Sequence, residues 1–122
     1  MTDGGVVWVW GRNCRGQLGL GNHTRQHVFH RWKAAACGSV PVVAVACGHD
    51  FLLALTQAGH VWSCGASDCG QLGHGTLDDL ATPTRVAALE TITMVTAGLD
   101  VAAAVGADGL VWMWASQESA LF

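Results

Sequence analysis

Basic side chains gather near the start of the chain, in and around the glycine-rich stretch WGRNCRGQLGLGN (residues 10–22). Residues 1–33 carry five basic side chains and one acidic one, whereas residues 34–122 carry one basic and eight acidic side chains. Clustered arginines attract an acidic partner and give salt-dependent affinity, although most charged loops are simply solvated. The two arginines of the glycine-rich stretch are favoured because glycines fix their loop. We therefore predict a partner-binding surface, whose candidate residues are Arg12, Arg15, Arg25, Arg31 and Trp32.

Three histidines at the loose spacing of metal ligands follow Cys14, namely His23, His27 and His30. A structural zinc site needs four ligands in tetrahedral geometry. These residues occupy a polar stretch that lacks a second cysteine pair, so we predict no metal site.

No other motif in the sequence predicts a cofactor site or an active site. The segment GQLGLG (16–21) departs from the dinucleotide fingerprint, lacks the Lys-Ser/Thr pair of a phosphate-binding loop and precedes no predicted helix. Serine, histidine and aspartate do not stand at a spacing that indicates a hydrolase. Asp50 and Asp100 recur at corresponding positions, which is more typical of turn residues than of catalysts. The sequence therefore predicts no catalytic residue and no cofactor.

The glycine-rich stretch occurs twice, because CGASDCGQLGHGT (64–76) repeats its Gly-x₄-Gly-Gln-Leu-Gly frame. An apolar, tryptophan-containing segment precedes each copy and occurs a third time at 108–115. Residues 43–59 and 93–109 match each other in the same way. We interpret the recurring positions as structural: Trp8, Trp10, Gly11, Gly16, Gln17, Leu18, Gly19, Gly48, Trp62, Gly65, Gly70, Gln71, Leu72, Gly73, Gly98 and Trp112.

Within the loop, each residue type has a plain structural use. Gly16 and Gly19 can adopt a positive φ and let the chain turn sharply. Leu18 can fill the core, and the Gln17 amide can satisfy backbone groups of the turn.

Short apolar runs bounded by Gly, Asp and Asn predict β-strands. Runs such as VVWVW (6–10) are apolar on both faces, so both faces of their sheet must be covered. We expect the recurring tryptophans to pack in the core, and Trp32, which lies outside these strands, to be the exposed one. The predicted strands are 6–10, 41–47, 51–56, 61–64, 92–96 and 110–114.

Short, doubly covered strands that repeat at about 50 residues are typical of β-propeller blades. We predict an all-β fold: a partial β-propeller of about two blades plus the first strand of a third, in an incomplete ring, because a closed ring needs at least four blades. Residues 1–115 form the repeats, with frames that start near residues 5, 59 and 109. Residues 116–122 are a divergent tail, which we interpret as a truncation, an alternative C-terminus or a fragment boundary.

The composition is that of a buried, turn-rich β protein, with 51% hydrophobic and 12% charged residues, 16 glycines and six tryptophans. Five cysteines, with no Cys-x-x-Cys pair and no secretory segment, predict reduced thiols in an intracellular protein of the cytoplasm or nucleus that is not secreted. No apolar run approaches the roughly 18 residues of a membrane-spanning helix.

Two segments together resemble the repeat of the regulator of chromosome condensation family, and the resemblance extends over residues 4–114. They are VWVWGRNCRGQLGLG and VVAVACGHDFLLALTQAGHVWSCGASDCGQLGHG. The pairing of ACGHDF with VWSCG is most similar to the branch of secretion-regulating guanine nucleotide exchange factors. The resemblance implies a seven-bladed propeller, since members of this family have that fold. It also implies a protein partner: the founding member is the exchange factor of a nuclear small GTPase and binds chromatin, and other members are binding platforms, for example in ubiquitin ligases.

Two positions depart from the family pattern. Phe51 and Val101 stand where the family usually has histidine, so we expect apolar packing to replace a polar anchor there. The Trp-Arg-His motif of the family's plant ultraviolet receptor is absent, and no residue identifies an exchange site.

From the resemblance we expect protein-interaction repeats, part of a guanine nucleotide exchange factor for a small GTPase, that make and break no covalent bond. The alternatives are a non-catalytic scaffold, which binds chromatin or assists a ubiquitin ligase, and a nonfunctional truncated product. We also expect the isolated chain to self-associate, because exposed strand edges and apolar faces attract partners.

Overall fold

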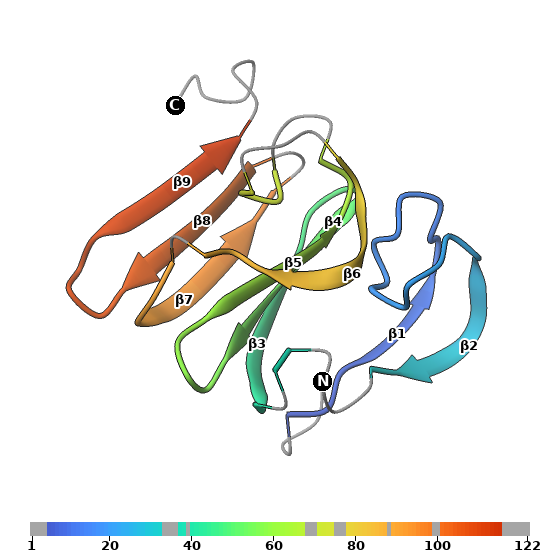
Figure 1. The fold of residues 1–122 in the computed structure, drawn as a ribbon, viewed down its shortest axis with the longest axis horizontal. Coiled ribbons are helices and arrows are strands. Elements are labelled where there is room, and N and C mark those ends of the chain that lie inside the picture. The colour runs from blue at the N-terminus through green and yellow to red at the C-terminus, as the bar shows by residue number, and fades with distance from the viewer. Residues whose placement is uncertain are drawn as a thin grey trace.

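The computed structural model describes residues 5–32, 37–38, 40–67, 71–74, 78–87, 89–98 and 101–115. The described residues form only β-strands and turns (Figure 1). In chain order the strands are β1 (Trp8–Gly11), β2 (Gln26–Arg31), β3 (Val42–Cys47), β4 (Phe51–Thr56), β5 (Val61–Gly65), β6 (Leu80–Arg85), β7 (Ile92–Ala97), β8 (Val101–Gly106) and β9 (Val111–Ala115). Lys33, Cys69, Gly70, Asp100 and the predicted tail 116–122 lie outside the described residues.

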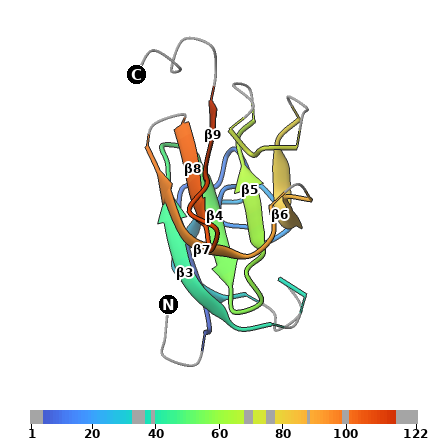
Figure 2. The same cartoon turned by 90° about the vertical axis from the view of Figure 1, so that its left-hand side faces the viewer.

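The strands form three antiparallel sheets in the orders β1-β2, β3-β4-β5-β6 and β7-β8-β9. They stand side by side like neighbouring blades, with β7 packed against β3 and β4 (Figures 1 and 2). The all-β partial propeller is thus confirmed, and its sheets do not close into a ring. The strands are nevertheless divided differently from the prediction: one blade has four strands, and the described parts of its neighbours have two and three.

This division arises because the sequence repeat and the blade are out of phase. The tryptophan segment that starts the second repeat forms β5, which is the third strand of the four-stranded sheet. Strands β3 and β4 of that sheet come from the first repeat, and β5 and β6 come from the second. Each repeat therefore joins two adjacent blades covalently.

For six strands, the predicted bounds agree with the observed bounds to within three residues at either end. The other three, β2, β6 and β8, were not predicted as strands. β2 (QHVFHR) and β6 (LATPTR) are polar or contain proline, and β8 (VAAAVG) consists largely of alanine. These residues have weak intrinsic strand preference, and pairing with β1, β5 and β7 makes up for it.

The main core lies between the second and third sheets. Every residue of β4 is buried, as expected for a strand covered on both faces. Phe51 is 2% exposed and belongs to this core, which agrees with the expected apolar packing at that position. Its fully buried aliphatic members include Leu53, Val61 and Leu72.

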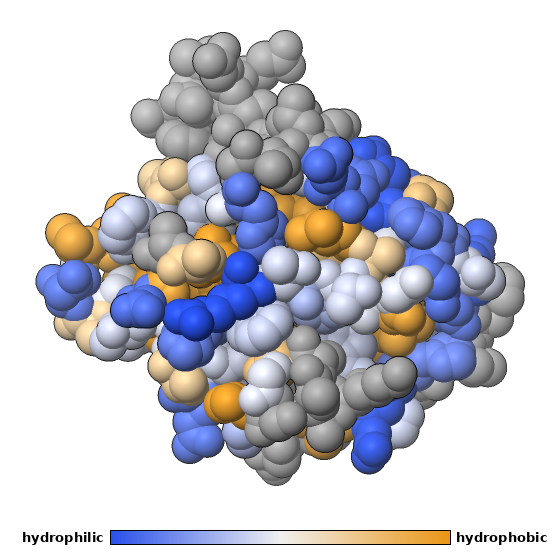
Figure 3. Space-filling model, in the orientation of Figure 1, coloured by the Kyte–Doolittle hydropathy of each residue, from blue (hydrophilic) through white to orange (hydrophobic). Residues whose placement is uncertain are grey.

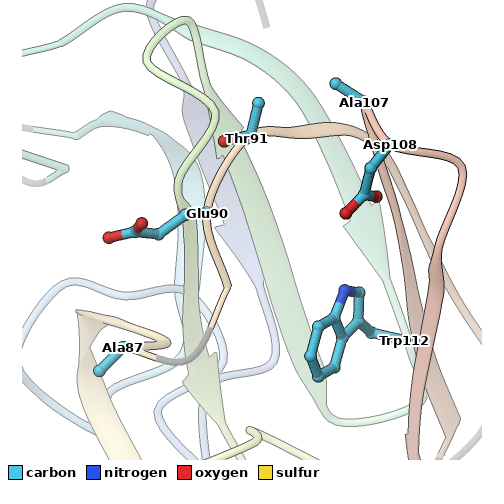
Figure 4. A pocket seen from close by; sticks show the side chains of 6 residues that line it. All are labelled: Ala87, Glu90, Thr91, Ala107, Asp108 and Trp112. Atoms are coloured by element: carbon cyan, nitrogen blue, oxygen red, sulfur yellow. The ribbon is translucent and has the colours of Figure 1, made fainter.

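The tryptophans of the outer sheets are less buried than predicted. Trp8 and Trp10 of β1 are 43% and 57% exposed, and Trp112 of β9 is 44% exposed. The prediction that these side chains pack in the core was wrong. Trp8 and Trp10 lie on the outer face of β1, whereas Trp112 shares a face with buried Ala104 of β8 but borders an open pocket (Figure 4). Val7 and Val9, on the other face of the β1 segment, are buried instead.

A pair of backbone hydrogen bonds occurs twice where neighbouring blades meet: the first bond of each pair joins the two blades, and the second lies within the later blade. At the first junction Val42 N donates to Gly5 O (3.4 Å), and Gln57 N donates to Pro41 O (2.9 Å). At the second, Ile92 N donates to Gly59 O (2.9 Å), and Ala107 N donates to Thr91 O (2.9 Å). Thr91, the counterpart of Pro41, has a φ of 57°.

Candidate partner-binding surface

The glycine-rich loop between β1 and β2 is organised around Asn13, which is 1% exposed. Its amide nitrogen donates to Asn22 O (2.9 Å) and Thr24 O (3.2 Å), and its Oδ1 accepts the Leu18 amide (3.0 Å). One buried side chain thus joins the start, the middle and the end of the loop. Its importance was missed in the sequence, because no repeated asparagine marks the position.

Glycine is required where the loop meets the next repeat. Gly16 has a φ of 76°, and a Cβ atom there would lie 2.6 Å from Ala81 Cα of β6. The Gly21 amide donates to Ala81 O (2.8 Å). The loop is therefore seated directly on the second repeat, and any side chain at position 16 would separate them.

Gln17 and Leu18, which follow Gly16, act as expected. Gln17 Oε1 accepts the Arg15 amide (2.9 Å), so the side chain satisfies the backbone of its own turn. Leu18 is 7% exposed within a hydrophobic cluster. In the second copy, Gln71 and Leu72 are both buried.

Arg15 is held by the second glycine-rich loop. Its Nε and Nη2 atoms donate to the two carboxylate oxygens of Asp79, at 2.7 and 3.1 Å. Asp79 Oδ1 also accepts the Ser67 amide (2.9 Å). The pKa of the Asp79 carboxyl is lowered, mainly by the hydrogen bond from Arg15. Burial acts in the opposite direction, and the hydrogen bond from Ser67 adds to the lowering. This arginine therefore connects two repeats.

Arg12 is more available, with 63% of its side chain exposed and one guanidinium nitrogen 3.5 Å from Asp50 Oδ1. Asp50 also lies 3.0 Å from His49 Nδ1, and its carbonyl oxygen accepts the Ala66 amide (2.9 Å). The aspartate thus supports the β3–β4 turn, in agreement with its interpretation as a turn residue.

Arg25 lies beside Arg12 at the base of the loop. Gly11 of β1 and Gln26 of β2 are paired in register, and Arg12 and Arg25 are the next residues outward from that pair. Both arginines are exposed. Hydrophilic side chains cover this end of the β1–β2 hairpin, at the upper right in Figure 3. We call Arg12, Arg25 and the half-buried Arg15 the loop-end basic surface.

Arg31 and Trp32 do not belong to this surface. Arg31 is paired with Trp8 at the other end of β2, and six residues of strand separate it from Arg25 by roughly 20 Å. Trp32 is 5% exposed, and its Nε1 donates to Leu18 O (2.7 Å). The expectation that Trp32 is exposed was wrong, because this side chain closes the core beneath the glycine-rich loop.

The second loop is fixed by a similar contact from the following repeat. Trp114 Nε1 donates to Gln71 O (2.7 Å), and its ring lies against Gly73. Ser63 Oγ donates to Leu72 O (2.8 Å) and lies 2.9 Å from Nε2 of His74, whose pKa burial lowers. Trp114 of the third sheet thus holds the loop of the second sheet, and at the corresponding position of the second sheet Cys64 Sγ lies 3.6 Å from Gln17 O of the first loop.

The described cysteines are all free thiols, at positions 14, 37, 47 and 64. Burial raises the pKa of Cys37 to about 12 and, together with the neighbouring Cys37 and Cys47, raises that of Cys64. Such thiols are poor nucleophiles and poor metal ligands. Within the described ranges, no three His, Cys, Asp or Glu side chains form a group that could hold a metal ion. The same ranges contain no helix that could cross a membrane.

The geometry of the loops and sheets agrees with a known repeat. The family model of the regulator of chromosome condensation (RCC1) repeat matches residues 4–55 and 58–105. The chain belongs to the RCC1 repeat family. Among curated relatives, the secretion-regulating guanine nucleotide exchange factor of Mus musculus is 40% identical over 116 residues, and the ultraviolet-B receptor UVR8 of Arabidopsis thaliana is 36% identical over 114.

These matches cover 93% and 92% of this RCC1 repeat chain, but only 25% and 26% of the two relatives. The chain therefore spans about a quarter of their length. Among solved structures, human WBSCR16 superposes with a TM-score of 0.80 at 35% identity, over 97% of this chain and 31% of that one. Prp20p of Saccharomyces cerevisiae superposes with a TM-score of 0.76 at 24% identity, over 87% and 28%, which supports the fold.

Proposed function

We propose that this RCC1 repeat chain is part of a partner-binding propeller that acts as a guanine nucleotide exchange factor for a small GTPase. The observation that carries the proposal is the loop-end basic surface, where Arg12 and Arg25 are exposed side by side on a loop fixed by Asn13 and glycine turns. The name of the mouse relative, which is 40% identical, supports exchange as the activity.

An exchange factor of this kind needs an interface and no reactive side chain. It binds the nucleotide-free GTPase more tightly than the nucleotide-bound form, and the difference in affinity shifts the equilibrium toward nucleotide release. Arginines on a rigid loop suit this task, because they contact an acidic surface without an ordering cost when the complex forms.

The test is a nucleotide-release assay with a panel of purified small GTPases loaded with a fluorescent GDP. We expect the chain to accelerate release from one of them, and Arg12→Glu to reduce that acceleration by about tenfold. Arg31→Glu makes the same charge change at the other end of β2 and is the matched control, with an expected effect below about twofold. Equal effects of the two substitutions would contradict the assignment of the loop end.

The runner-up is a non-catalytic scaffold, which binds chromatin or assists a ubiquitin ligase. A stable complex with a partner, without faster nucleotide release, would favour the scaffold. A chain that binds no partner in either test would favour the third alternative, a nonfunctional truncated product.

We also propose that the isolated chain self-associates. Trp8 at one end of the row of sheets, and Val111 and Met113 at the other, are between 43% and 61% exposed. Apolar side chains on outer strands favour association with a second copy or with further blades.

A further inference from the structure

The two glycine-rich loops satisfy the same backbone carbonyl group with different side chains. In the first loop, Trp32 Nε1 donates to Leu18 O (2.7 Å). The corresponding residues of the second repeat are Val86 and Leu72, and a valine side chain has no donor. Ser63 takes over this role, because its Oγ donates to Leu72 O (2.8 Å).

This role of Ser63 determines which nitrogen of His74 carries a hydrogen. Ser63 is 1% exposed, and His74 Nε2 lies 2.9 Å from its hydroxyl oxygen. A serine hydroxyl has a single proton, which here is directed to Leu72 O, so its oxygen can only accept a hydrogen bond from His74. The hydrogen-bond network thus assigns the hydrogen of the neutral ring to Nε2, and an added proton has to go to Nδ1.

The polar pair of Ser63 and His74 is particular to the second loop. Val9 and Leu20 stand at the corresponding positions of the first repeat. Val9 belongs to the hydrophobic cluster of that repeat, and Leu20 packs against it. The Gly-Gln-Leu-Gly turn therefore does not require these polar groups, and an ionisable side chain lies where the first repeat has an aliphatic one.

His74 lies in surroundings that disfavour a positive charge. Burial lowers its pKa below the ordinary value of 6.5, and no charged side chain of the described residues contributes to that shift. On the adjacent strands, Ser63 is paired with Leu53 of β4 and Thr84 of β6, neither of which ionises. Arg85, the next residue of β6, belongs to the opposite face of the sheet. A protonated ring therefore gains more from water than from this site.

The residues just before His74 carry a contact between the second and third sheets. Trp114 Nε1 of β9 donates to Gln71 O (2.7 Å). The uncharged indole ring also lies against Gly73, where a Cβ atom would be 3.1 Å from Nε1. Because His74 directly follows Gly73, a movement of the histidine ring would disturb the surface on which Trp114 rests.

We propose that Ser63 and His74 form a pH-sensitive latch, which holds the second glycine-rich loop and, through Trp114, the third sheet against the second. While the histidine ring is neutral, it donates to Ser63 and the loop is closed. Protonation at Nδ1 places a charge in half-buried surroundings, and the loop opens so that water can solvate the ring. The latch does not depend on exchange activity.

The direction of the pH effect follows from the two states of the loop. In the open loop the pKa of His74 has its ordinary value of 6.5, and in the closed loop it is lower. The open loop thus binds more protons at acidic pH, which favours opening. The latch has its full stability above pH 6.5 and loses it as the pH falls through the lower pKa of the closed loop.

The test follows hydrogen exchange at the indole N–H of Trp114 in the 122-residue chain, with nitrogen-15 in its tryptophans. Trp32 is the internal reference, because its indole holds the first loop, where Leu20 replaces the histidine. Between pH 7.5 and pH 5.5 we expect the protection of Trp114, relative to that of Trp32, to fall about threefold or more. Trp114→Phe identifies the signal. An equal change at both tryptophans would overturn the proposal.

Two variants show whether His74 is responsible. His74→Gln keeps an N–H donor for Ser63 and cannot be protonated, so we expect it to abolish the pH dependence of Trp114 protection. His60→Gln makes the same substitution in the hairpin between β4 and β5 and is the matched control, which should leave that dependence unchanged. A pH dependence that persists in His74→Gln, or that is lost in His60→Gln, would also count against the latch.

Nitrogen-15 spectra of the histidine rings test the same step in the unchanged chain. We expect the ring of His74 to carry its hydrogen on Nε2 at pH 7.5. It should gain a proton on Nδ1 over the same pH range in which the protection of Trp114 falls. A hydrogen on Nδ1 at pH 7.5, or a titration outside that range, would show that this pair is not a latch.

Discussion

At the scale of single residues, the arginines near the start of the chain differ in what their guanidinium groups contact. Arg15 pairs with Asp79, 64 residues away, through two hydrogen bonds. Arg12 has a longer contact with Asp50 and keeps most of its side chain in solvent. Both arginines lie on the same short loop, so position in the folded chain decides that Arg15 joins two repeats while Arg12 is available to a partner.

The Arg15–Asp79 pair should make stability depend on pH. The pKa of Asp79 is lowered in the folded chain, so its contribution is present above the carboxyl pKa of the unfolded chain, near 4, and is lost as the pH falls through the lower folded value. We expect Asp79→Asn to lower the free energy of unfolding by about 0.5–1 kcal/mol at pH 7, a modest value because about a third of each side chain remains exposed.

Urea unfolding at pH 7 and pH 3 measures this effect, and the difference between Asp79→Asn and the unchanged chain should shrink at the lower pH. Asp78→Asn removes an adjacent, exposed carboxylate and is the control. An equal loss for the two variants, or a difference that is the same at both pH values, would show that the pair does not stabilise the fold.

Residue roles were predicted correctly where they depend on local chain geometry, as for Gln17 and Leu18 in their turn. They were missed where they depend on distant contacts. Trp32 is buried because its indole nitrogen donates to the Leu18 carbonyl and its ring packs in the core beneath the loop. Arg15 pairs with Asp79, which lies in a loop of the next repeat. Periodicity carries no information about either contact.

At the scale of elements, the junctions between blades repeat with one local difference. Pro41 and Thr91 occupy corresponding positions directly before β3 and β7, and each carbonyl group accepts an amide from the next hairpin of its own sheet, that of Gln57 or Ala107. Thr91 has a φ of 57°, a conformation that is costly for a β-branched residue. The second junction therefore keeps its hydrogen bonds at the expense of backbone strain.

Replacement of Thr91 by glycine should relieve this strain. We expect Thr91→Gly to raise the free energy of unfolding by about 0.5–1 kcal/mol, because the strain removed exceeds the added entropy of the unfolded chain. Pro41→Gly is the matched control, and it should lower stability because it adds unfolded-chain entropy where no strain exists. Both are measured by urea unfolding; a loss of stability for Thr91→Gly would contradict the strain.

The strands themselves were predictable to the extent that their residues are apolar and β-branched. The repeated segment 51–56 forms β4 as predicted. β6 contains Pro83 and β8 is rich in alanine, so intrinsic preference gives little signal for either, and their neighbours in the sheet determine them. The division of strands among three blades was not predictable from the repeat frame, because the frame begins in the middle of a blade.

At the scale of the whole molecule, the chain is a run of RCC1 repeats that spans about a quarter of its curated relatives. The loop-end basic surface belongs to the first sheet, which agrees with the basic excess of residues 1–33. We expect it to select an acidic partner.

The central claim, that the loop-end basic surface prefers a nucleotide-free GTPase, is tested most directly by the solution mass of the chain. Light scattering should be recorded for the chain alone, with the responsive GTPase stripped of nucleotide, and with the same GTPase loaded with GDP. We expect a defined complex with the nucleotide-free form only, and we expect Arg12→Glu to abolish it. Complexes of equal mass with both forms, or an Arg12→Glu chain that binds as well as the unchanged one, would contradict it.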